Sequence, residues 1–294
     1  MSSHSKRKHA FCGASTASRW MKCPGSLYLG FGIRTPVKSY TVEGTRGHEL
    51  AEKMLHEWLR TGTLSDEYIR DRVLEYKDTE EPDEWRPGVR RKNMALYCAE
   101  YIDAVKDELT MFSGKPNILV EKQLDLDHDL NMFGTLDFFA TGPVAAGINK
   151  STYPPSHAGL IVDFKYGVGV QVVASENWQL AYYACMLAKN SKFNLAGVRV
   201  AICQPRAEIK RSSVWFSAEE LVDRATALRN GAIRAIYQAA VREPELHAGE
   251  HCRFCPAKNT CSEYAELSPP KAEPVAVSNE IPTDCETPAF TDLE

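Results

Sequence analysis

The sequence contains no apolar run long enough to cross a bilayer. Its longest uncharged stretches, residues 138–149 and 177–188, fall well short of the roughly 18 residues that a transmembrane helix requires. No apolar segment follows the basic Lys6-Arg7-Lys8, so we expect no secretory signal and a cytoplasmic location. Internal repeats are also absent. We therefore expect neither a membrane partner nor a repeat architecture.

Neither sign of charge dominates the chain. The 35 lysines and arginines face 39 acids, and the net charge of −4 argues against a generally cationic nucleic-acid coat. The acidic excess is local, because residues 266–294 hold seven acids, one lysine and five prolines, as is typical of a disordered tail. That tail carries −6, so residues 1–265 carry the remaining +2. The net charge therefore does not count against a DNA substrate.

The nine cysteines are an odd number, and a reducing cytoplasm does not favour a disulfide framework. Three of them are spaced as metal ligands. Cys252 and Cys255 form a Cys-x-x-Cys pair, and Cys261 follows after five residues. This spacing predicts a metal site near the end of the chain.

Hydrophobic periodicity divides the chain into a helical part and a mixed part. We expect helices over residues 42–59 and 90–111, strands over 118–124, 132–140 and 160–165, a helix over 176–190, a strand over 195–204, and a helix over 217–241. The charge-rich residues 66–91 are typical of helix fragments and loop. Ser217 and Glu220 stand in capping-box register at the start of the last helix.

The fold class that follows is α/β, with an α+β mixed sheet. The chain has 294 residues, which suffice for one large domain or two of ordinary size. Its composition, with 44% hydrophobic and 25% charged residues, is typical of a soluble globular enzyme. We divide the chain into a disordered N-terminus (1–14), an N-terminal helical region (15–115), a core (116–244), a cysteine-rich segment (245–265) and a disordered acidic tail (266–294).

Acidic residues occur on three successive predicted strands. Asp163 and Lys165 share one face of their strand because side chains alternate. Asp137, within Gly134-Thr135-Leu136-Asp137, lies on the strand before it, and Glu121 on the strand before that. Three such acids can converge on a hard divalent cation, commonly Mg²⁺ in phosphate chemistry. The alternative is that each acid is an exposed strand residue.

Two further groups could join these acids. Gln179 and Tyr183 are four residues apart on the predicted helix 176–190, so they share a face that can reach the strand ends. His48 lies early in the helix over 42–59. Imidazole is a common metal ligand, but a packed or solvated histidine is the plainer alternative.

The order of these motifs resembles a known nuclease family. Gly-x-x-x-His, Gly-Thr-x-Asp, Asp-x-Lys, Gln-x-x-x-Tyr and Cys-x-x-Cys-x5-Cys follow one another, as in the RecB-like branch of the PD-(D/E)XK nuclease superfamily. Within that branch the chain is most similar to iron–sulfur members, Cas4-like proteins and the AddB nuclease domain, in a form common in phages and prophages. The resemblance covers roughly residues 15 to 265 and implies a restriction-endonuclease-like core over 116–244, flanked by N-terminal helices and a cluster-binding segment.

The resemblance also implies residue roles. Asp137 and Asp163 look like the metal-binding acids, with the backbone carbonyl of Phe164 and the imidazole of His48 as further ligands of Mg²⁺ or Mn²⁺. Lys165 is the signature lysine, and Gln179 with Tyr183 match the helix motif that orders the site. Glu121 stands where relatives often have an acid. The signature's second acid is Asp163 rather than glutamate, and this shorter side chain can shift the metal preference.

For the cysteines, the resemblance implies a [4Fe–4S] cluster with Zn²⁺ as the alternative, since four thiolates suit either. Cys252, Cys255 and Cys261 would supply three ligands. Cys23 stands where the distant fourth ligand is expected, and Cys12 is the weaker candidate. Such a cluster would connect the N-terminal and C-terminal segments.

The function implied is that of a metal-dependent DNA nuclease, an exonuclease acting on DNA ends or single-stranded DNA in phage recombination, replication or repair. The metal ion would activate a water molecule for attack on the phosphodiester. A single-strand annealing or binding protein is the expected protein partner. The alternatives are a catalytically idle DNA-binding accessory protein and an accessory nuclease within a larger complex; polarity, strand preference and oligomeric state stay open.

Basic and aromatic residues near the motifs could contact such a DNA. Phosphates could be bound by Arg19, Lys22, Arg46, Arg90, Arg91, Lys92, Lys165, Lys210 and Arg211. Trp20, Tyr166 and Trp178 could stack on unpaired bases, or they could belong to the core.

Overall fold

A single five-stranded sheet forms the centre of the protein. The computed structural model describes residues 10–33, 39–76, 93–144, 157–168 and 170–267. The strands lie in chain order, as β1 (Asn117–Asp127), β2 (Met132–Pro143), β3 (His157–Phe164), β4 (Leu195–Cys203) and β5 (Arg211–Ser217). All neighbouring pairs are antiparallel except β3 and β4, which are parallel and connected through helix α6 (Trp178–Asn190).

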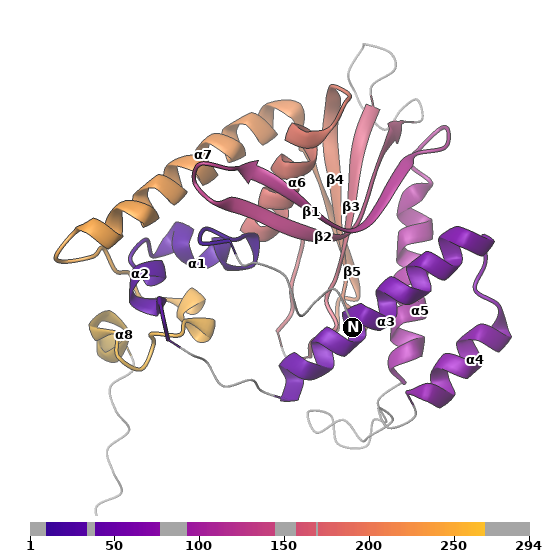
Figure 1. Ribbon diagram of the computed structural model, residues 1–294, viewed down its shortest axis with the longest axis horizontal. Helices are drawn as coiled ribbons and strands as arrows, with labels where there is room; N and C mark the ends of the chain where they lie inside the picture. Colours follow the sequence, from indigo (N-terminus) through magenta and orange to yellow (C-terminus); the bar gives the residue numbers. More distant parts are fainter. Residues whose placement is uncertain (1–9, 34–38, 77–92, 145–156, 169, 268–294) are drawn as a thin grey trace, which may run out of the picture.

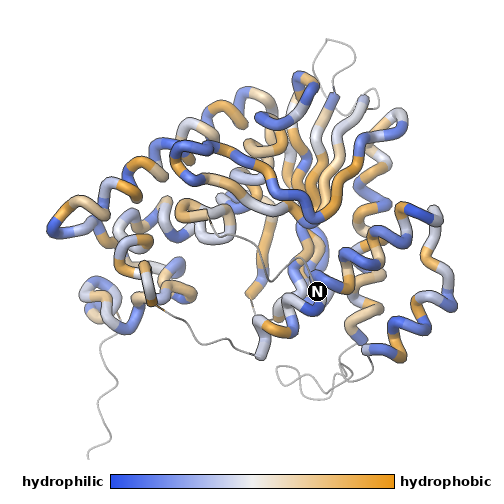
Figure 2. The backbone as a smooth tube through the Cα atoms, in the orientation of Figure 1, coloured by the Kyte–Doolittle hydropathy of each residue, from blue (hydrophilic) through white to orange (hydrophobic). Residues whose placement is uncertain are grey.

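Helices cover both faces of this sheet, and each face has its own hydrophobic core (Figure 1). Helices α3 (Ser39–Thr61) and α5 (Met94–Leu109) pack on one face, and α6 and α7 (Ala218–Tyr237) on the other. Strand β3 lies between the two cores: Leu160 and Val162 belong to the first core and Ile161 to the second, as alternation requires. Figure 2 shows the resulting apolar centre, with hydrophilic residues along the outer helix faces.

The two ends of the described chain meet on the α6–α7 side. The short helices η2 (Ala14–Thr16), α1 (Ala17–Lys22) and α2 (Ser26–Gly30) pack against α6 and α7. Trp20, in α1, is fully buried and donates its indole N–H to the Gly13 carbonyl at 3.1 Å. The segments η4 (Gln238–Ala240), η5 (Glu250–Phe254) and α8 (Ser262–Leu267) follow α7, and the Gly25 amide donates to the Glu245 carbonyl at 2.8 Å.

The α+β mixed sheet expected from the sequence is confirmed. The order α5, β1, β2, β3, α6, β4 is consistent with a restriction-endonuclease-like core. Strand β5 was not predicted, because its polar edge sequence Arg-Ser-Ser-Val-Trp-Phe-Ser has little apolar character. Lys165 lies one residue beyond β3, although its amide still donates to the Cys203 carbonyl of β4 at 2.9 Å.

Two further expectations differ from the structure. Within residues 10–14, assigned to a disordered N-terminus, Cys12 and Ala14 are buried in the second core and Phe11 packs against it. Residues 266–267, assigned to the tail, belong to α8. Residues 1–9, 77–92 and 268–294 lie outside the described ranges, so the expectations about them remain predictions.

Helix α4 (Asp66–Glu75) accounts for the first part of the charge-rich segment. None of the described helices combines the length and apolarity needed to span a bilayer.

Candidate active site

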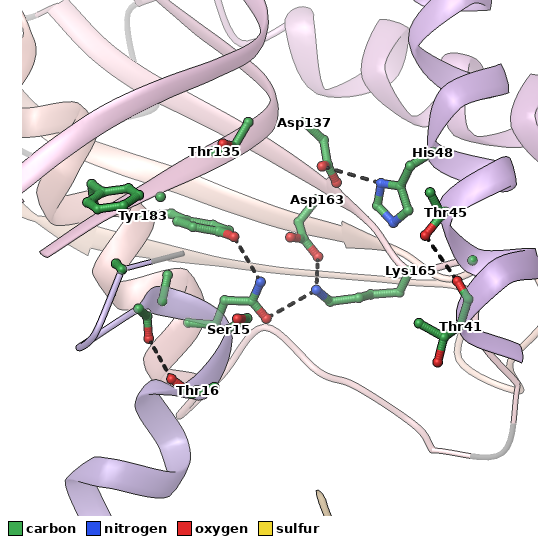
Figure 3. A pocket seen from close by; sticks show the side chains of 17 residues that line it. Ser15, Thr16, Thr41, Thr45, His48, Thr135, Asp137, Asp163, Lys165 and Tyr183 are labelled. Atoms are coloured by element: carbon green, nitrogen blue, oxygen red, sulfur yellow. Dashed lines mark hydrogen bonds and ion pairs between the residues drawn. The ribbon is translucent and has the colours of Figure 1, made fainter. Parts of the chain in front are cut away.

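The motif residues line one open cleft of about 620 Å³ at the ends of β2 and β3 (Figure 3). One wall comes from residues 10 and 13–16, and the opposite wall from α3. Six of the seven predicted catalytic residues line the cleft: His48, Asp137, Asp163, Lys165, Gln179 and Tyr183. Elements that are distant in sequence therefore bring these side chains together.

Three side chains at one side of the cleft form a group that can hold a divalent metal ion. Ligand atoms of His48, Glu121 and Asp137 lie within 4.8 Å of one another. The Nδ1 atom of His48 is 3.4 Å from Oδ1 of Asp137, and Oδ2 of Asp137 accepts a hydrogen bond from the Phe164 amide at 2.9 Å. Two carboxylates and one imidazole form the kind of donor set that binds divalent cations of the Mg²⁺ and Mn²⁺ type.

The electrostatics of this group follow from its burial and its charges. Burial raises the pKa of Asp137, but the neighbouring His48 charge and hydrogen bond outweigh that effect, and the net pKa is lowered. Burial lowers the pKa of His48, but Asp137 more than reverses this, and the net pKa is raised. In the absence of a cation, the two side chains therefore favour a charged pair.

Glu121 has an unusual backbone conformation within β1. Its φ angle of 47° lies in the left-handed region, which is costly for a residue with a side chain. The β1–β2 pairing keeps one register on both sides, through Val120 with Phe138 and Lys122 with Leu136, and is interrupted where Glu121 faces Asp137; a separate register shift lies at Asp125–Asp127. The strained residue is thus the one that contributes the third possible ligand.

A chain of polar contacts crosses the other side of the cleft. The Nζ atom of Lys165 lies 2.9 Å from Oδ2 of Asp163 and donates to Oε1 of Gln179 at 3.1 Å. The amide nitrogen of Gln179 in turn donates to the Tyr183 hydroxyl at 3.0 Å. Burial raises the pKa of Asp163 above its ordinary value despite the neighbouring lysine. Asp163, which we expected as a metal ligand, contacts Lys165 in this structure and is not one of the three clustered ligand residues.

Helix α3 approaches the sheet closely because residue 47 is a glycine. A Cβ atom at Gly47 would lie 2.8 Å from Cγ of the buried Tyr166 ring. That ring is held in place: the Arg206 guanidinium lies 4.7 Å from its centroid, and Arg206 also pairs with Glu43 of α3 at 3.0 Å. The contact sets the position of His48, the next residue, relative to β3. The sequence pattern did not single out Arg206, whose partners are more than 30 residues away.

Gln204 organises the segment between Lys165 and α6. Its buried side chain donates to the carbonyls of Gly167 at 3.2 Å and Val170 at 2.8 Å. Its carbonyl oxygen accepts from the Val172 amide at 3.0 Å and from the Gln171 side chain at 3.3 Å. Sequence reasoning also missed this residue, since a single glutamine at a strand end gives no periodic signal.

The four predicted cluster cysteines line a common small cavity beside α1. Cys23 joins Cys252, Cys255 and Cys261 there, together with Arg19, His247 and His251. The His247 amide donates to the sulfur of Cys23, and the Gly249 amide to that of Cys252, both at 3.4 Å. Cys12 does not line this cavity. It is buried in the second core, where burial raises its thiol pKa to about 12.

Several predicted DNA contacts are engaged elsewhere in the structure. Trp20 and Tyr166 are buried, which favours the core alternative for them over base stacking. Lys210 and Arg211 pair with Glu100 and Asp107 of α5, and the Arg46 guanidinium lies 4.7 Å from the Tyr76 ring centroid. Residues 90–92 are outside the described ranges.

A family model matches most of the chain. It is the model of DUF2800, described as a protein of unknown function, and it covers residues 9–272. The chain belongs to this family. The DUF2800 protein is also similar to a crystal structure of a candidate exonuclease from Eubacterium rectale, with 12% identity, a TM-score of 0.41, and coverage of 92% of this chain and 93% of that chain.

A second solved structure, SSO0001, is 13% identical to the DUF2800 protein, with a TM-score of 0.28 and coverage of 75% of this chain and 98% of that chain. Both TM-scores are below 0.5, so neither likeness supports an inference about activity.

Proposed function

We propose that this protein is a divalent-metal-dependent deoxyribonuclease, an exonuclease that acts on DNA ends or single-stranded DNA in recombination, replication or repair. One observation carries the proposal: ligand atoms of His48, Glu121 and Asp137 lie within 4.8 Å of one another, and His48 and Asp137 line the cleft that also contains the Asp163–Lys165 pair. A metal group beside a fixed cation suits phosphodiester hydrolysis, in which negative charge develops on phosphate oxygens. The RecB-like and Cas4-like resemblance is part of this proposal.

In this mechanism His48, Glu121 and Asp137 would hold the cation. The bound cation would polarise the scissile phosphate and lower the pKa of a water molecule. Lys165 places its ammonium beside the phosphate, and Asp163 with Gln179 fixes the position of that ammonium. Because one ligand is an imidazole nitrogen, whereas Mg²⁺ prefers oxygen ligands, we expect Mn²⁺ to support the reaction better than Mg²⁺.

Hydroxyl groups on the walls of the cleft suit a phosphate backbone. The hydroxyls of Ser15, Thr41 and Thr135 line the cleft and can donate to phosphate oxygens (Figure 3). Those of Thr16 and Thr45 also line it, but they donate their protons to the carbonyls of Gly13 and Thr41.

The proposal includes a [4Fe–4S] cluster on Cys23, Cys252, Cys255 and Cys261. These four cysteines line one small cavity, and backbone amides donate to the sulfurs of Cys23 and Cys252, as is common around metal-bound thiolates. Four thiolates suit either an iron–sulfur cluster or Zn²⁺, so the choice of the cluster rests on the family resemblance.

The nuclease proposal is tested on end-labelled single-stranded and blunt duplex DNA, with Mn²⁺, Mg²⁺ or a chelator. We expect hydrolysis that requires the cation and that falls by about 100-fold or more in Asp137→Asn and Lys165→Ala, since the first weakens cation binding and the second removes the ammonium beside the phosphate. Calorimetric titration with Mn²⁺ should show weakened binding to Asp137→Asn.

Asp103→Asn is the matched control, because Asp103 is an exposed acid that pairs with Lys106 on α5. It should leave the rate unchanged. Full activity in both cleft variants, or in the chelator, would overturn the proposal. DNA binding without hydrolysis under every cation would instead favour the idle accessory protein.

A further inference from the structure

Exposed aromatic side chains lie at the edge of the cleft, on the side of α1 and α2. Phe31, which directly follows α2, is 78% exposed, and Tyr28 is 45% exposed. The rings of Phe31 and Phe11 meet edge to face, with centroids 6.4 Å apart. Phe11 is partly buried against the second core and follows Ala10, which lines the cleft. Phe31 therefore contacts the segment that forms one wall of the cleft.

The fold holds these rings at the surface rather than in the core. The Phe31 amide donates to the Tyr28 carbonyl at 3.1 Å, which closes the last turn of α2 and fixes the backbone of both residues. A Cβ atom at Gly30 would lie 3.4 Å from Cγ of Pro256, so the end of α2 lies close to the cysteine-rich segment. Exposing the apolar surface of a phenylalanine to water is unfavourable, and the same surface is available to bind an apolar or aromatic group.

Positive charge accompanies the exposed aromatic rings. Arg19, in α1, donates to the Phe254 carbonyl at 3.4 Å, and the Phe254 side chain is itself 65% exposed. The Arg253 guanidinium lies 5.6 Å from the centroid of that ring. Aromatic rings interspersed with arginines are the usual composition of surfaces that bind single-stranded nucleic acid.

We propose that Phe11, Tyr28 and Phe31 form a stacking platform that binds the unpaired bases of single-stranded DNA and leads the strand into the cleft. The inference rests on the proposed function and specifies its substrate class. Unpaired bases expose their π-faces, whereas the bases of a duplex are already stacked on each other, so such a platform selects single strands without reading sequence. Continuity with the cleft, together with the nearby arginines, favours DNA over a protein as the occupant.

The test measures binding without divalent cation, so that hydrolysis does not interfere. Fluorescence anisotropy compares labelled single-stranded and duplex oligonucleotides on the full-length protein and on Phe31→Ala and Phe31→Trp. Phe31→Ala should weaken single-strand binding by roughly 5- to 100-fold, the effect of losing one base stack, and leave duplex binding unchanged. Phe31→Trp should bind single strands at least as tightly as the unaltered protein.

Phe193→Ala is the matched control, since Phe193 is 45% exposed but stacks on His157 at the opposite end of β3 from Asp163. It should not change either affinity. An abasic residue moved along the oligonucleotide adds a second measurement. When the abasic residue replaces the base that stacks on Phe31, it should weaken binding to the unaltered protein and leave the affinity of Phe31→Ala unchanged.

Unchanged single-strand binding by Phe31→Ala would overturn the platform, as would an equal loss on duplex DNA. A concentration-dependent dimer that dissociates in Phe31→Ala, with no effect on DNA, would assign the surface to a second copy and also overturn it. Phe31-dependent binding in a protein that never hydrolyses DNA would support the platform while overturning the proposed function. Hydrolysis of single strands that Phe31→Ala leaves unchanged would overturn the platform alone.

Discussion

Lys165 and Asp163 form an ion pair that contributes little to folding. Burial lowers the pKa of Lys165, but Asp163 more than compensates, so the ammonium stays charged. The free energy needed to remove two buried charges from water is about as large as the free energy of their attraction. A protein with well-packed apolar residues in place of such a pair is often equally stable. A charged pair at the edge of an apolar sheet, next to a possible metal group, is therefore better explained by chemistry than by stability.

At the same scale, the four side-chain contacts of Gln204 lead to a prediction. Gln204→Leu would leave two carbonyls and the Val172 amide without their buried partner, and the segment after Lys165 would lose its fixed path. We expect the free energy of unfolding to fall by about 1–3 kcal/mol and kcat to fall while single-strand affinity is retained. Urea titration and single-turnover hydrolysis measure these quantities.

The control for Gln204 is Gln123→Leu, which changes an exposed glutamine on β1. It should leave both stability and kcat unaltered. If Gln204→Leu lowers stability but hydrolyses DNA at the normal rate, Gln204 does not position the site.

Not every residue of the cleft could be found from the sequence. The order of the motifs singled out His48, Asp137, Asp163, Lys165 and Gln179, which the fold brings together. Residues that act through tertiary contacts alone, such as Gln204 and Arg206, carry no local pattern. The same holds for the left-handed backbone of Glu121, because the residue type does not reveal its φ angle.

At the scale of elements, the sequence predicted those with strong periodicity and missed those without it. Strands β1 to β4 and helices α3, α5, α6 and α7 were expected, with boundaries within a few residues. The capping box was expected and is present: Ser217 accepts from the Glu220 amide, and the Glu220 carboxylate accepts from the Ser217 amide. The polar edge strand β5 is stabilised by its pairing with β4 rather than by its own composition.

The capping box predicts a pH-dependent contribution to stability. Its hydrogen bonds lower the folded-state pKa of Glu220 below 4.5, so the contribution is present above that pH and is lost as the pH falls through the lowered value. Glu220→Gln should therefore destabilise the protein at neutral pH, by up to about 1 kcal/mol at low salt, and have little effect in acid. Ser217→Ala should cost about 1 kcal/mol.

Glu219→Gln serves as the comparison, because Glu219 lies in the same first turn of α7 without the capping bond. The difference between the two variants in urea titrations isolates that bond. Equal effects of both variants at every pH would show that only the helix dipole is involved.

At the scale of the whole molecule, the cleft lies where the two hydrophobic cores meet. His48 comes from a helix of the first core, Gln179 and Tyr183 from a helix of the second, and the acids from the sheet between them. In the wall formed by residues 13–16, Ala14 belongs to the second core, and α1 leads from this wall to Cys23. Helix α1 thus connects one wall of the cleft to the cysteine cavity.

The proposed cluster predicts that the protein, purified without oxygen, is brown and contains about four irons per chain. Cys23→Ala should lose the iron, because the N-terminal ligand is gone. It should also lose stability, by about 4 kcal/mol if the cluster constrains the chain as a covalent cross-link over a long loop does. Metal analysis and chemical unfolding measure both effects.

Cys12→Ala is the control for the cluster, since Cys12 is a buried thiol outside the cavity. It should keep the full iron content. A colourless protein with one zinc per chain would disprove the iron–sulfur centre, and a metal-free protein of normal stability would disprove any cysteine-bound metal.

The contact between Gly47 and Tyr166 also bears on how this site can vary. Because the ring at position 166 occupies the space that a side chain at position 47 would need, the two positions are not free to change separately. A homologue with alanine at position 47 would need a smaller residue at 166, and Arg206 would then lose the ring on which it lies. We therefore expect these three positions to vary together, even in relatives whose metal-binding residues are unchanged.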